Sequence, residues 1–575
     1  MKSLDSEISA ISLEPLEDRI APAATVTYTD WDGDIVKITA STGPLDEADL
    51  SFIGGGTSGQ LDTLTLLDPE FAGAKITFSV KKADGGDGQA DVDFINAAGV
   101  DLASVSVKGD LGRIDAGDGN DDVEALGSLS ALSMGLSTGM HGLESTIAGS
   151  LGALKISGIM ATVHVRVAGD IGSVSIKSLI GGFDADSGSI QADGAINSVS
   201  VKGSLVGGDG ANSGSILAGT SIGKVSVSGN LSGGGGENSG GIASNGAIDS
   251  VSIGGDIVGG SGSNSGGVAS ASDVVNSVKV KGSIFGGAGG TSGGIVGNDG
   301  VGSVSIGGDI VGGSGDNSGG VGTFGAIDSV KIKGGITGGA GFQSGTIALG
   351  FGDLGSASIG GNLVGGSGEQ SGGIGAFGDL NKITIKGSII GGSGVESGGL
   401  LSLGGNINTV SIGRDIIGGT GNSSGGLLAD EAIGSVKIKG SIIGAGVTGT
   451  ASIDGTGVIS SGTGIGSVSL GGSLISGFNN GTGDLENSGA IITDGAIGSV
   501  SIKGSVVGNY SSLPRISAVG ATPTGEQVAI NSVSIGGDFL LGLVLAGLNR
   551  NGDQVNNDAT VGSVTVKGDT YFPVS

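Results

Sequence analysis

The sequence contains no cysteine, 7 prolines, 2 histidines and only 3% aromatic residues in 575 positions. Without cysteine, the fold cannot use disulfide bonds or thiolate metal centres for stability. Basic residues are also scarce: 26 Lys and Arg stand against 55 Asp and Glu, which gives a formal net charge of -29. A charge of this sign and size repels nucleic acid and anionic membrane surfaces. We therefore expect no nucleic-acid partner.

Glycine dominates what is present, with 130 residues. Glycine at this level, without the triplet period of collagen, is typical of disordered chains. Yet 37% of the residues are hydrophobic, which supplies enough Ile, Val and Leu to form a buried core. The composition therefore favours a folded repeat protein.

The repeat is seen in the stretch GAIDSVSIGGDIVGGSG at residues 246–262, whose relatives recur every 25 to 27 residues. When the copies are aligned on Val251, the reference residue falls at positions 174, 199, 225, 251, 278, 304, 330, 357, 383, 410 and 436. The spacing then widens to 31 to 33 residues, at 468, 500, 533 and 564. Upstream, we assign the same position to Leu154, Leu132 and Val105, which makes about 18 copies.

Each copy has the pattern of short strands separated by glycine. In IDSVSI (248–253), apolar and polar residues alternate with a period of two, as in a half-buried strand. A unit of this size cannot bury its own apolar side, so the copies must stack. We predict an all-β fold, a single-stranded parallel β-helix (β-solenoid) of about 18 turns, right-handed as parallel crossovers usually are. With strands about 4.8 Å apart, the rod would be on the order of 85 Å long.

Two polar columns accompany the repeat. A serine precedes the third strand of each copy at positions 213, 239, 265, 292, 318, 344, 371, 397 and 424. An amide precedes this serine in most copies: Asn212, Asn238, Asn264, Asn317, Gln343 and Gln370. Amides in register can hydrogen-bond along a stack. The simplest interpretation is a structural ladder in the turns, and the alternative is a ligand-binding groove.

Lysine alternates with glycine at another position of the repeat. The lysines are Lys281, Lys333, Lys386 and Lys439, and the glycines between them are Gly254, Gly307, Gly360 and Gly413. Lysine on every turn would stack like charges about 4.8 Å apart. We therefore interpret the alternation as a means of separating like charges on a solvated face. On the glycine turns we expect aspartates to pair diagonally with these lysines: Asp256, Asp309 and Asp415. A binding face for an acidic or glycan partner is the alternative.

We divide the chain into four parts: an extension (1–24), a β-rich cap (25–100), a regular β-helix (101–460), and a β-helix with longer turns and a C-terminal cap (461–575). The stretch TVTYTDWDGDIVKITA (25–40) predicts a hairpin that turns at Asp32–Gly33. The stretch DFLLGLVLAGL (538–548) is far shorter than the roughly 20 residues of a membrane span, so no transmembrane span is expected.

The segment LEPLEDRIAPAA at residues 13–24 lacks the long apolar stretch of a secretory signal. It resembles the short LEPLEDR-type N-terminal segment of large bacterial exported β-strand-repeat surface proteins. The glycine-rich repeats resemble β-helical adhesins and surface-layer-like proteins as a class. This resemblance implies an extracellular or cell-surface location. Residues 1–24 would then be an export signal or an assembly segment.

We expect no enzyme activity. His141 and His164 are the only histidines, and Trp31, the only tryptophan, lies outside the repeat. An acid-base or nucleophilic site needs several convergent groups of matched pKa. The sequence also shows no basic cluster or sugar-stacking aromatics of the kind expected in pectate-lyase-like β-helices.

Calcium is the one cofactor that the sequence indicates. The stretch AGDGNDDV (116–123) resembles the nonapeptide of repeat-in-toxin β-rolls, with Asp118 and Asp121 as candidate ligands. The stretch GGDGQADV (85–92) adds Asp87, although alanine occupies its main liganding position. Carboxylate and backbone oxygens are the ligands that calcium prefers. A second candidate site, for which an acidic turn is the simpler explanation, consists of Asp30, Asp32 and Asp34.

Taken together, these features favour a non-catalytic structural rod that forms a homo-oligomer or polymer. Its ends would add strands to neighbouring rods and build a filament or a surface lattice. The alternatives are a monomeric adhesin stalk, and a β-helix that binds or cleaves a glycan.

Overall fold

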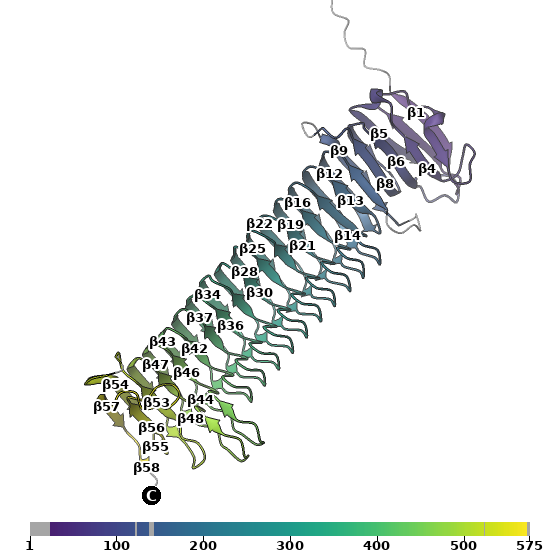
Figure 1. Cartoon of the computed structure of the whole chain (residues 1–575). Coiled ribbons are helices and arrows are strands. Elements are labelled where there is room, and N and C mark those ends of the chain that lie inside the picture. The colour runs from purple at the N-terminus through teal and green to yellow at the C-terminus, as the bar shows by residue number, and fades with distance from the viewer. Residues whose placement is uncertain (1–22, 121–123, 137–142, 523, 572–575) are drawn as a thin grey trace, which may run out of the picture.

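The computed structural model describes residues 23–120, 124–136, 143–522 and 524–571, which form a long rod of stacked strands (Figure 1). Within these ranges there is no α-helix, and the helical elements are two short 3-10 helices, η1 (Glu47–Asp49) and η2 (Pro69–Phe71). Successive turns pair in parallel and in constant register, as in Val251 opposite Val278 and Val278 opposite Val304. The predicted all-β parallel β-helix is confirmed.

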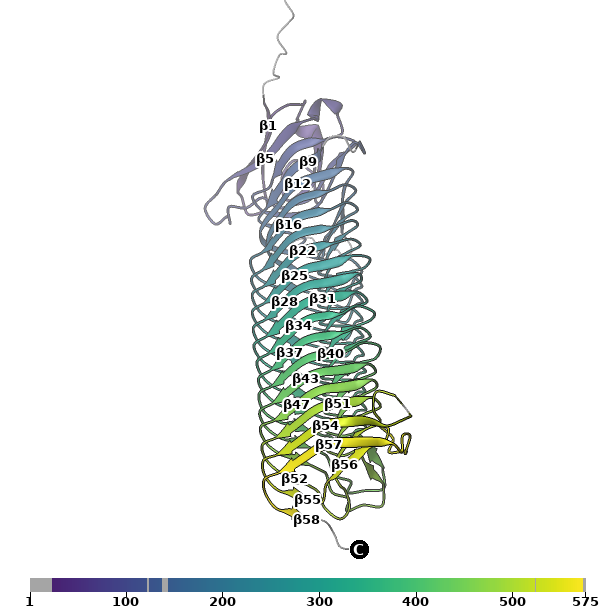
Figure 2. The same cartoon turned by 90° about the vertical axis from the view of Figure 1, so that its left-hand side faces the viewer.

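The strands fall into three columns that run along the rod (Figure 1), and the first column faces the viewer in Figure 2. The first column contains β7 (Leu102–Ser106), β9 (Glu124–Ala131), β12 (Ser150–Ala161), β14 (Ile171–Ile180), β16 (Ile196–Val201), β19 (Ile222–Val227), β22 (Ile248–Ile253), β25 (Val274–Val280), β28 (Gly300–Ile306), β31 (Ala326–Ile332), β34 (Leu354–Ile359), β37 (Leu380–Ile385), β40 (Ile407–Ile412), β43 (Ala432–Ile438), β47 (Gly464–Leu470), β51 (Ala496–Ile502), β54 (Gln527–Ile535) and β57 (Ala559–Val566). The third column contains β6 (Val92–Ala98), β8 (Asp110–Gly117), β11 (Glu144–Ile147), β13 (His164–Val167), β15 (Ser189–Ala192), β18 (Ile216–Ala218), β21 (Ile242–Ser244), β24 (Val268–Ser270), β27 (Ile295–Gly297), β30 (Val321–Thr323), β33 (Ile347–Leu349), β36 (Ile374–Ala376), β39 (Leu400–Ser402), β42 (Leu427–Ala429), β46 (Ile459–Ser461), β50 (Ile491–Thr493), β53 (Arg515–Ala518) and β56 (Leu543–Ala546).

The second column consists of two-residue strands between these two. From the middle of the rod onward its members are β17 (Leu205–Val206), β20 (Leu231–Ser232), β23 (Ile257–Val258), β26 (Ile284–Phe285), β29 (Ile310–Val311), β32 (Ile336–Thr337), β35 (Leu363–Val364), β38 (Ile389–Ile390), β41 (Ile416–Ile417), β44 (Ile442–Ile443), β48 (Leu474–Ile475), β52 (Val506–Val507), β55 (Phe539–Leu540) and β58 (Thr570–Tyr571). Their first residues, such as Ile257 and Ile284, point into the interior and are buried, except in β58, where Thr570 is exposed.

Period-two alternation builds the interior. In β22, Ile248, Val251 and Ile253 are buried, whereas the residues between them face outward. Ile257 of β23 and Val268 of β24 complete the interior of the same turn. Full burial of an aliphatic side chain of this size stabilises by about 1.5–3 kcal/mol. Each turn therefore depends on its neighbours, which supply the walls of one continuous core.

The tight turn before each third-column strand explains the serine and amide columns. Asn264 and Gly266 both adopt positive φ, 55° and 64°. The serine between them, Ser265, is fully buried. Its hydroxyl accepts a hydrogen bond from the N–H of Gly260 at 3.0 Å and donates one to a carbonyl of the same turn at 2.7 Å. The serine column is thus a structural element of the turns.

One repeat position was assigned wrongly from the sequence. The residue that pairs with Val105 and Leu154 is Leu129, which is fully buried, and not Leu132, which is 41% exposed. Leu132 follows the end of β9 and directly succeeds the inward-facing Ala131, so its side chain points outward. The upstream copies lack the DSVSIGG phrase that fixes the register elsewhere.

Antiparallel strands close the N-terminal end of the rod. β1 (Ala24–Thr29) and β2 (Ile35–Ala40) form the predicted hairpin, and β2 also pairs with β5 (Ala74–Lys81). Beside them, β3 (Leu50–Phe52) pairs with β4 (Leu61–Thr65). Parallel stacking already begins here, between β4 and β6 and between β5 and β7. No helix in the described chain is long and apolar enough to cross a membrane.

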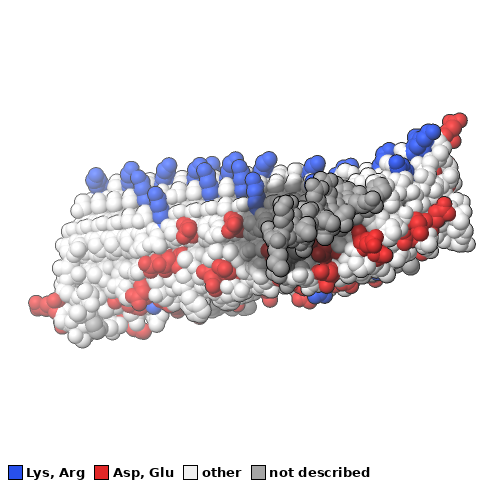
Figure 3. Space-filling model, turned by 90° about the horizontal axis from the view of Figure 1, so that it is seen from above, with Lys and Arg blue, Asp and Glu red and all other residues white. Residues whose placement is uncertain are grey.

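Basic side chains line one edge of the rod (Figure 3). Many of them lie on or directly after first-column strands, at Lys177, Lys202, Lys224, Lys279, Lys281, Lys331, Lys333, Lys382, Lys386, Lys437 and Lys439. The predicted diagonal pairs with Asp256, Asp309 and Asp415 are not formed. The ion pairs between described residues join Arg166 to Asp193 and Arg550 to Asp494.

Close packing supplies a second reason for the lysine and glycine alternation. A Cβ on Gly307 would lie 2.0 Å from the carbonyl oxygen of Lys281 on the preceding turn, and Gly360 has the same relation to Lys333. Each glycine therefore accommodates the backbone of a neighbouring lysine turn, in addition to separating the charges.

Candidate functional site

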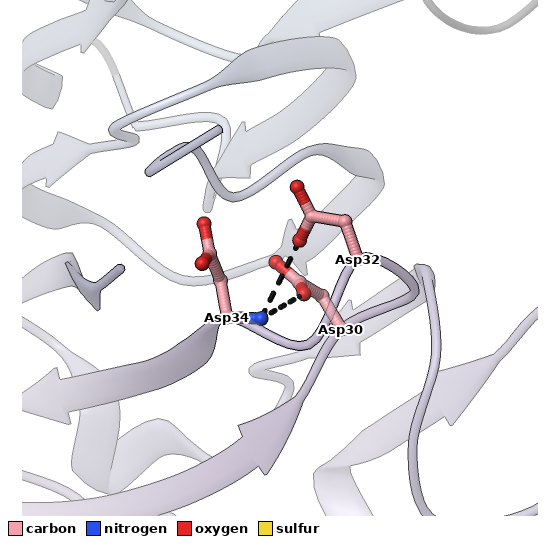
Figure 4. A group of neighbouring side chains, drawn as sticks. All are labelled: Asp30, Asp32 and Asp34. Atoms are coloured by element: carbon pink, nitrogen blue, oxygen red, sulfur yellow. Dashed lines mark hydrogen bonds between the residues drawn. The ribbon is translucent and has the colours of Figure 1, made fainter. Parts of the chain in front are cut away.

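The hairpin loop between β1 and β2 carries three aspartates whose side chains converge, Asp30, Asp32 and Asp34 (Figure 4). A ligand oxygen from each lies within 4.8 Å of the others, and no other group of three or more His, Asp or Glu within the described ranges meets this criterion. Asp34 is fully buried, whereas Asp32 is exposed. The turn places alternate residues on one side, so the sequence spacing anticipated this cluster.

Hydrogen bonds give these aspartates a structural role. The carboxylate of Asp34 accepts bonds from the N–H groups of Ala83 at 2.6 Å and Gly88 at 2.5 Å. Asp32 accepts a bond of 2.7 Å from the N–H of Asp87, and Asp30 accepts one of 2.7 Å from the N–H of Asp34. The hairpin loop is therefore tied to the loop that follows β5.

The crowded carboxylates shift each other's titration. Burial, followed by a hydrogen bond with Asp32, raises the pKa of Asp30 to about 6. The same shared hydrogen bond, together with the N–H of Asp87, lowers the pKa of Asp32. Two carboxyl groups this close do not ionise independently, because the charge of one raises the cost of ionising the other.

The structure adds partners that the sequence did not connect with this cluster. Asp87, predicted as a ligand in a separate motif, lies beside Asp32. Together they line a small cavity of about 110 Å³, whose other lining residues are Asp30, Trp31, Gln60, Gln89 and Asp91. Burial raises the pKa of Asp91. Gln60 and Asp91 come from other strands and loops, so no local spacing could have revealed them.

The β-roll-like stretch at 116–123 does not lie in a single element of the structure. Its first residues end β8, and Asp118 follows this strand, donating its N–H to Asp101 at 3.1 Å and accepting the N–H of Asn120 at 2.8 Å. The other predicted ligand, Asp121, lies outside the described residues.

The donor chemistry of the hairpin cluster fits a hard cation, because calcium binds carboxylate and carbonyl oxygens. Asp30, Asp32 and Asp34 would supply its carboxylate ligands, because their oxygens converge, and Asp87 lies beside them with both of its oxygens already bonded to Gln89. Calcium binding stays a prediction, and the acidic turn also has a sufficient structural explanation.

His164 projects from β13 and is largely buried. Burial lowers its pKa, and its Nε2 atom has no hydrogen-bond partner. The other histidine, His141, lies outside the described residues.

A long groove runs over the outer face of the third column. Its floor consists of the middle residue of each short strand, and it spans adjoining hollows of about 670 and 420 Å³ that share Thr291, Gly294 and Val296. One wall is the left-handed turn position, occupied by Asn238, Asn264, Thr291, Asn317, Gln343 and Gln370. The opposite wall follows the strands and includes Asn245, Ala271, Asn298, Phe324, Phe377 and Leu403. The amide column therefore forms one wall of a groove, as the alternative interpretation of this column requires.

The aromatic residues of this groove were missed by the sequence analysis. Phe324, Phe342 and Phe377 line the second hollow, and Phe351 packs against Phe377 with ring centroids 6.1 Å apart. Phe324 and Phe377 directly follow β30 and β36 at the same position of the repeat, but Phe342 lies at another position, and phenylalanine recurs in too few copies to form a sequence motif. The signal was their concentration in 324–377 of a chain that is otherwise poor in aromatics.

The strand β57 presents a second candidate surface. It pairs with β54 along one edge and has no partner along the other among the residues described here. Val564 is 47% exposed, whereas Val500 and Val533, its equivalents on the preceding turns, are buried.

Comparison with known proteins gives no match: no family model fits the chain, and no curated protein or solved structure is detectably similar to it.

Proposed function

We propose that this protein is a non-catalytic, extracellular structural rod of a bacterium that assembles with copies of itself into a filament or surface lattice. The observation that carries the proposal is the edge of β57 that has no strand partner among the described residues. An unpaired strand edge with exposed apolar residues is a template for the addition of another strand.

Side chains beside this edge support strand addition. Along the corner after the first column, Asp538 accepts a hydrogen bond of 2.9 Å from the N–H of Asp569 on the next turn. Asp569 holds the equivalent place on the last turn, and its carboxylate has no such donor within the described ranges. An added strand would supply the missing N–H, cover Val564 and continue the parallel register.

Another copy of the chain is the partner that fits best. Residues 1–22 join β1, which lies at the opposite end of the rod from β57 (Figure 1). End-to-end stacking of two rods would bring the β1 end of one molecule against the β57 edge of the other. The extracellular location rests on the resemblance of the N-terminal segment to those of exported surface proteins.

Electron microscopy of the purified full chain tests the proposal. We expect the wild type to form filaments or sheets, and Val564→Lys to leave single rods because it places a charge on the joining edge. Val395→Lys is the matched control, since Val395 is similarly exposed but lies in a mid-rod turn, and it should assemble as the wild type does. Removal of residues 1–24 should abolish assembly if that segment supplies the strand. Single rods of wild-type protein at all concentrations would refute the proposal, as would normal assembly of Val564→Lys.

A further inference from the structure

We propose that the groove over the third column binds a neutral polysaccharide chain that lies along the rod. This inference goes beyond the assembly function and concerns a different surface. It rests on the shape of the floor, on the exposed aromatic rings and on the absence of Lys and Arg from the lining of the described hollows.

The floor of the groove carries small residues at positions where the backbone conformation does not require them. Gly322, Ala348 and Gly375 occupy the middle positions of three successive strands, β30, β33 and β36. Both glycines have ordinary negative φ values, and a Cβ on Gly375 would meet no atom within 4 Å. The equivalent position carries leucine on other turns, at Leu217, Leu401 and Leu428. Small residues here leave a slot, and turn geometry does not explain them.

The slot is flanked by aromatic rings from both walls. Phe324 and Phe377 stand on one side and Phe342 on the other, and all three line the same hollow of about 420 Å³. The ring of Phe324 lies against Gly350 on the next turn, where a Cβ would come within 2.9 Å of it. Phe351 and Phe377 form a tilted pair beside it. The absence of a side chain at Gly350 thus makes room for the aromatic wall.

These rings are exposed, although the chain contains few aromatic residues. The exposed fractions of Phe324, Phe342, Phe351 and Phe377 range from 40% to 81%. A concentration of exposed apolar rings in one hollow marks a binding surface rather than a packing requirement. The C–H faces of sugar rings stack on such aromatic surfaces.

Amide groups supply the hydrogen bonds that sugar hydroxyls need. Gln343 donates to Gln370 at 2.7 Å, and Gln370 donates to Glu396 at 2.8 Å, so the side chains of this wall are held in register. Each amide can donate two hydrogen bonds and accept two, so each keeps free capacity toward the groove. The other half of the groove is lined by further amides: Asn238, Asn245, Asn264 and Asn298.

The charges in the groove lining and the pairing of the floor strands indicate which class of ligand fits. No Lys or Arg lines the described hollows of the groove. Its carboxylates are Asp193, in the hollow without aromatic rings, and Glu396, which lines a small hollow beside Gly375 and accepts a hydrogen bond from Gln370. With a net charge of -29, the protein disfavours an acidic polymer at this site. An added peptide strand is disfavoured too, because the floor strands pair on both sides and leave no free edge. A neutral glycan needs neither charge nor an open edge.

The groove repeats with the rod, which suits a linear polymer. Each turn adds a floor residue and a polar wall residue, an amide on most turns, about every 4.8 Å. A chain of sugar units lying along this axis would meet the same contacts repeatedly, with the aromatic slot as its strongest contact. Several modest contacts in series then give measurable affinity.

Two measurements test this inference. The full-length protein is first applied to an array of neutral and acidic linear oligosaccharides, and calorimetry then measures its affinity for the best-bound neutral compound. We expect binding to neutral glycans, with affinity reduced at least tenfold in Gly375→Leu, which fills the slot with a side chain that the fold accepts at this position elsewhere. Phe324→Ala combined with Phe377→Ala should have a similar effect. Phe183→Ala and Phe478→Ala remove exposed rings that do not line the groove, and they should bind as the wild type does.

Failure of any neutral glycan to bind, a preference for acidic glycans, or unchanged affinity in Gly375→Leu would each overturn the inference. Circular dichroism of each variant distinguishes loss of the site from loss of the fold. Val564→Lys should bind the same glycan with unchanged affinity, because the edge of β57 lies outside the groove. The two proposals can therefore fail separately.

Discussion

The carboxylate of Asp256 accepts a hydrogen bond of 2.8 Å from the backbone N–H of Ser283 on the next turn. The relation continues along this corner of the rod: the N–H of Asp256 donates to Asn230 at 3.0 Å, and Ser283 accepts the N–H of Asp309 at 3.0 Å. The sequence had suggested that Asp256 pairs with a lysine. Instead, its carboxylate satisfies a backbone donor between turns.

Asp256→Ala should therefore lower the free energy of unfolding by about 1 kcal/mol, because the N–H of Ser283 loses its acceptor. Asp256→Asn keeps a side-chain oxygen and should restore most of the stability. Hydrogen exchange of the Ser283 amide and thermal unfolding measure the effect. A loss that disappears at high salt would indicate an ion pair and contradict this account, because salt screens charge pairs.

Ser265→Ala should cost about 1–3 kcal/mol, since it removes the acceptor of the partly buried N–H of Gly260 and the hydroxyl donor of the buried carbonyl of Gly262. The control is Ser261→Ala in the same turn, because Ser261 is exposed. Chemical denaturation of both variants gives the comparison. Equal stabilities would show that the serine column is not needed for the turn.

Two glycines should respond in opposite ways to alanine. Gly266 has a φ of 64°, and a Cβ there would lie 2.2 Å from the carbonyl oxygen of Val258, so Gly266→Ala should cost about 1–3 kcal/mol or more. Gly375→Ala should change the stability by less than about 0.5 kcal/mol. Thermal unfolding separates the two, and a large loss in Gly375→Ala would mean that the groove floor is constrained by packing.

The stability of the N-terminal cap should depend on the protonation of Asp30. Its folded-state pKa of about 6 lies above the ordinary 3.8, so the folded state binds more protons than the unfolded state between these values. The contribution of Asp30 is therefore present at low pH and is lost as the pH rises through about 6. Hydrogen exchange of residues 82–91 from pH 4 to 7 measures this dependence, which Asp30→Asn should flatten.

The lowered pKa of Asp32 has the opposite sign, with stability present above its ordinary pKa and lost on acidification. Asp32→Asn thus separates the two contributions. If wild type and Asp30→Asn show the same pH profile, the protonation of Asp30 does not contribute to stability.

Calcium at millimolar concentration should raise the thermal stability of the cap above pH 6, where Asp30 is ionised, and chelator should reverse the gain. Asp32→Asn should abolish the response. Asp118→Asn should not, because Asp118 forms its hydrogen bonds at a different corner of the rod. Identical unfolding of the wild type in calcium and in chelator would assign the cluster a purely structural role.

The columns of the regular turns follow from sequence because their cause is local. The alternation in 248–253 predicted the buried face of β22, and the spacing of the copies predicted parallel stacking in register. Upstream, this reasoning selected Leu132 over Leu129. Single leucines do not define a register where the repeat phrase is lost, and only the pairing with Val105 and Leu154 decides it.

The candidate sites, too, were predictable from local spacing only in part. Asp30, Asp32 and Asp34 were found from their spacing, because a tight hairpin turn brings alternate side chains together. Gln60 and Asp91 join them through contacts between distant strands. In the groove, Phe324 and Phe377 lie two turns apart along the rod, which corresponds to 53 positions in the sequence. Their common wall is created by stacking.

The sequence by itself determined the β-helix, because period-two alternation and a fixed repeat length leave an apolar side that only stacked parallel turns can bury. It also determined which turns contain glycine and serine. The tertiary structure decided what the outer surface of the described chain offers: the open floor at Gly375 between aromatic walls, the raised pKa of Asp30 beside Asp32, and the exposed Val564 on β57. These features depend on which distant side chains become neighbours after stacking, and a one-dimensional repeat does not encode them as a motif.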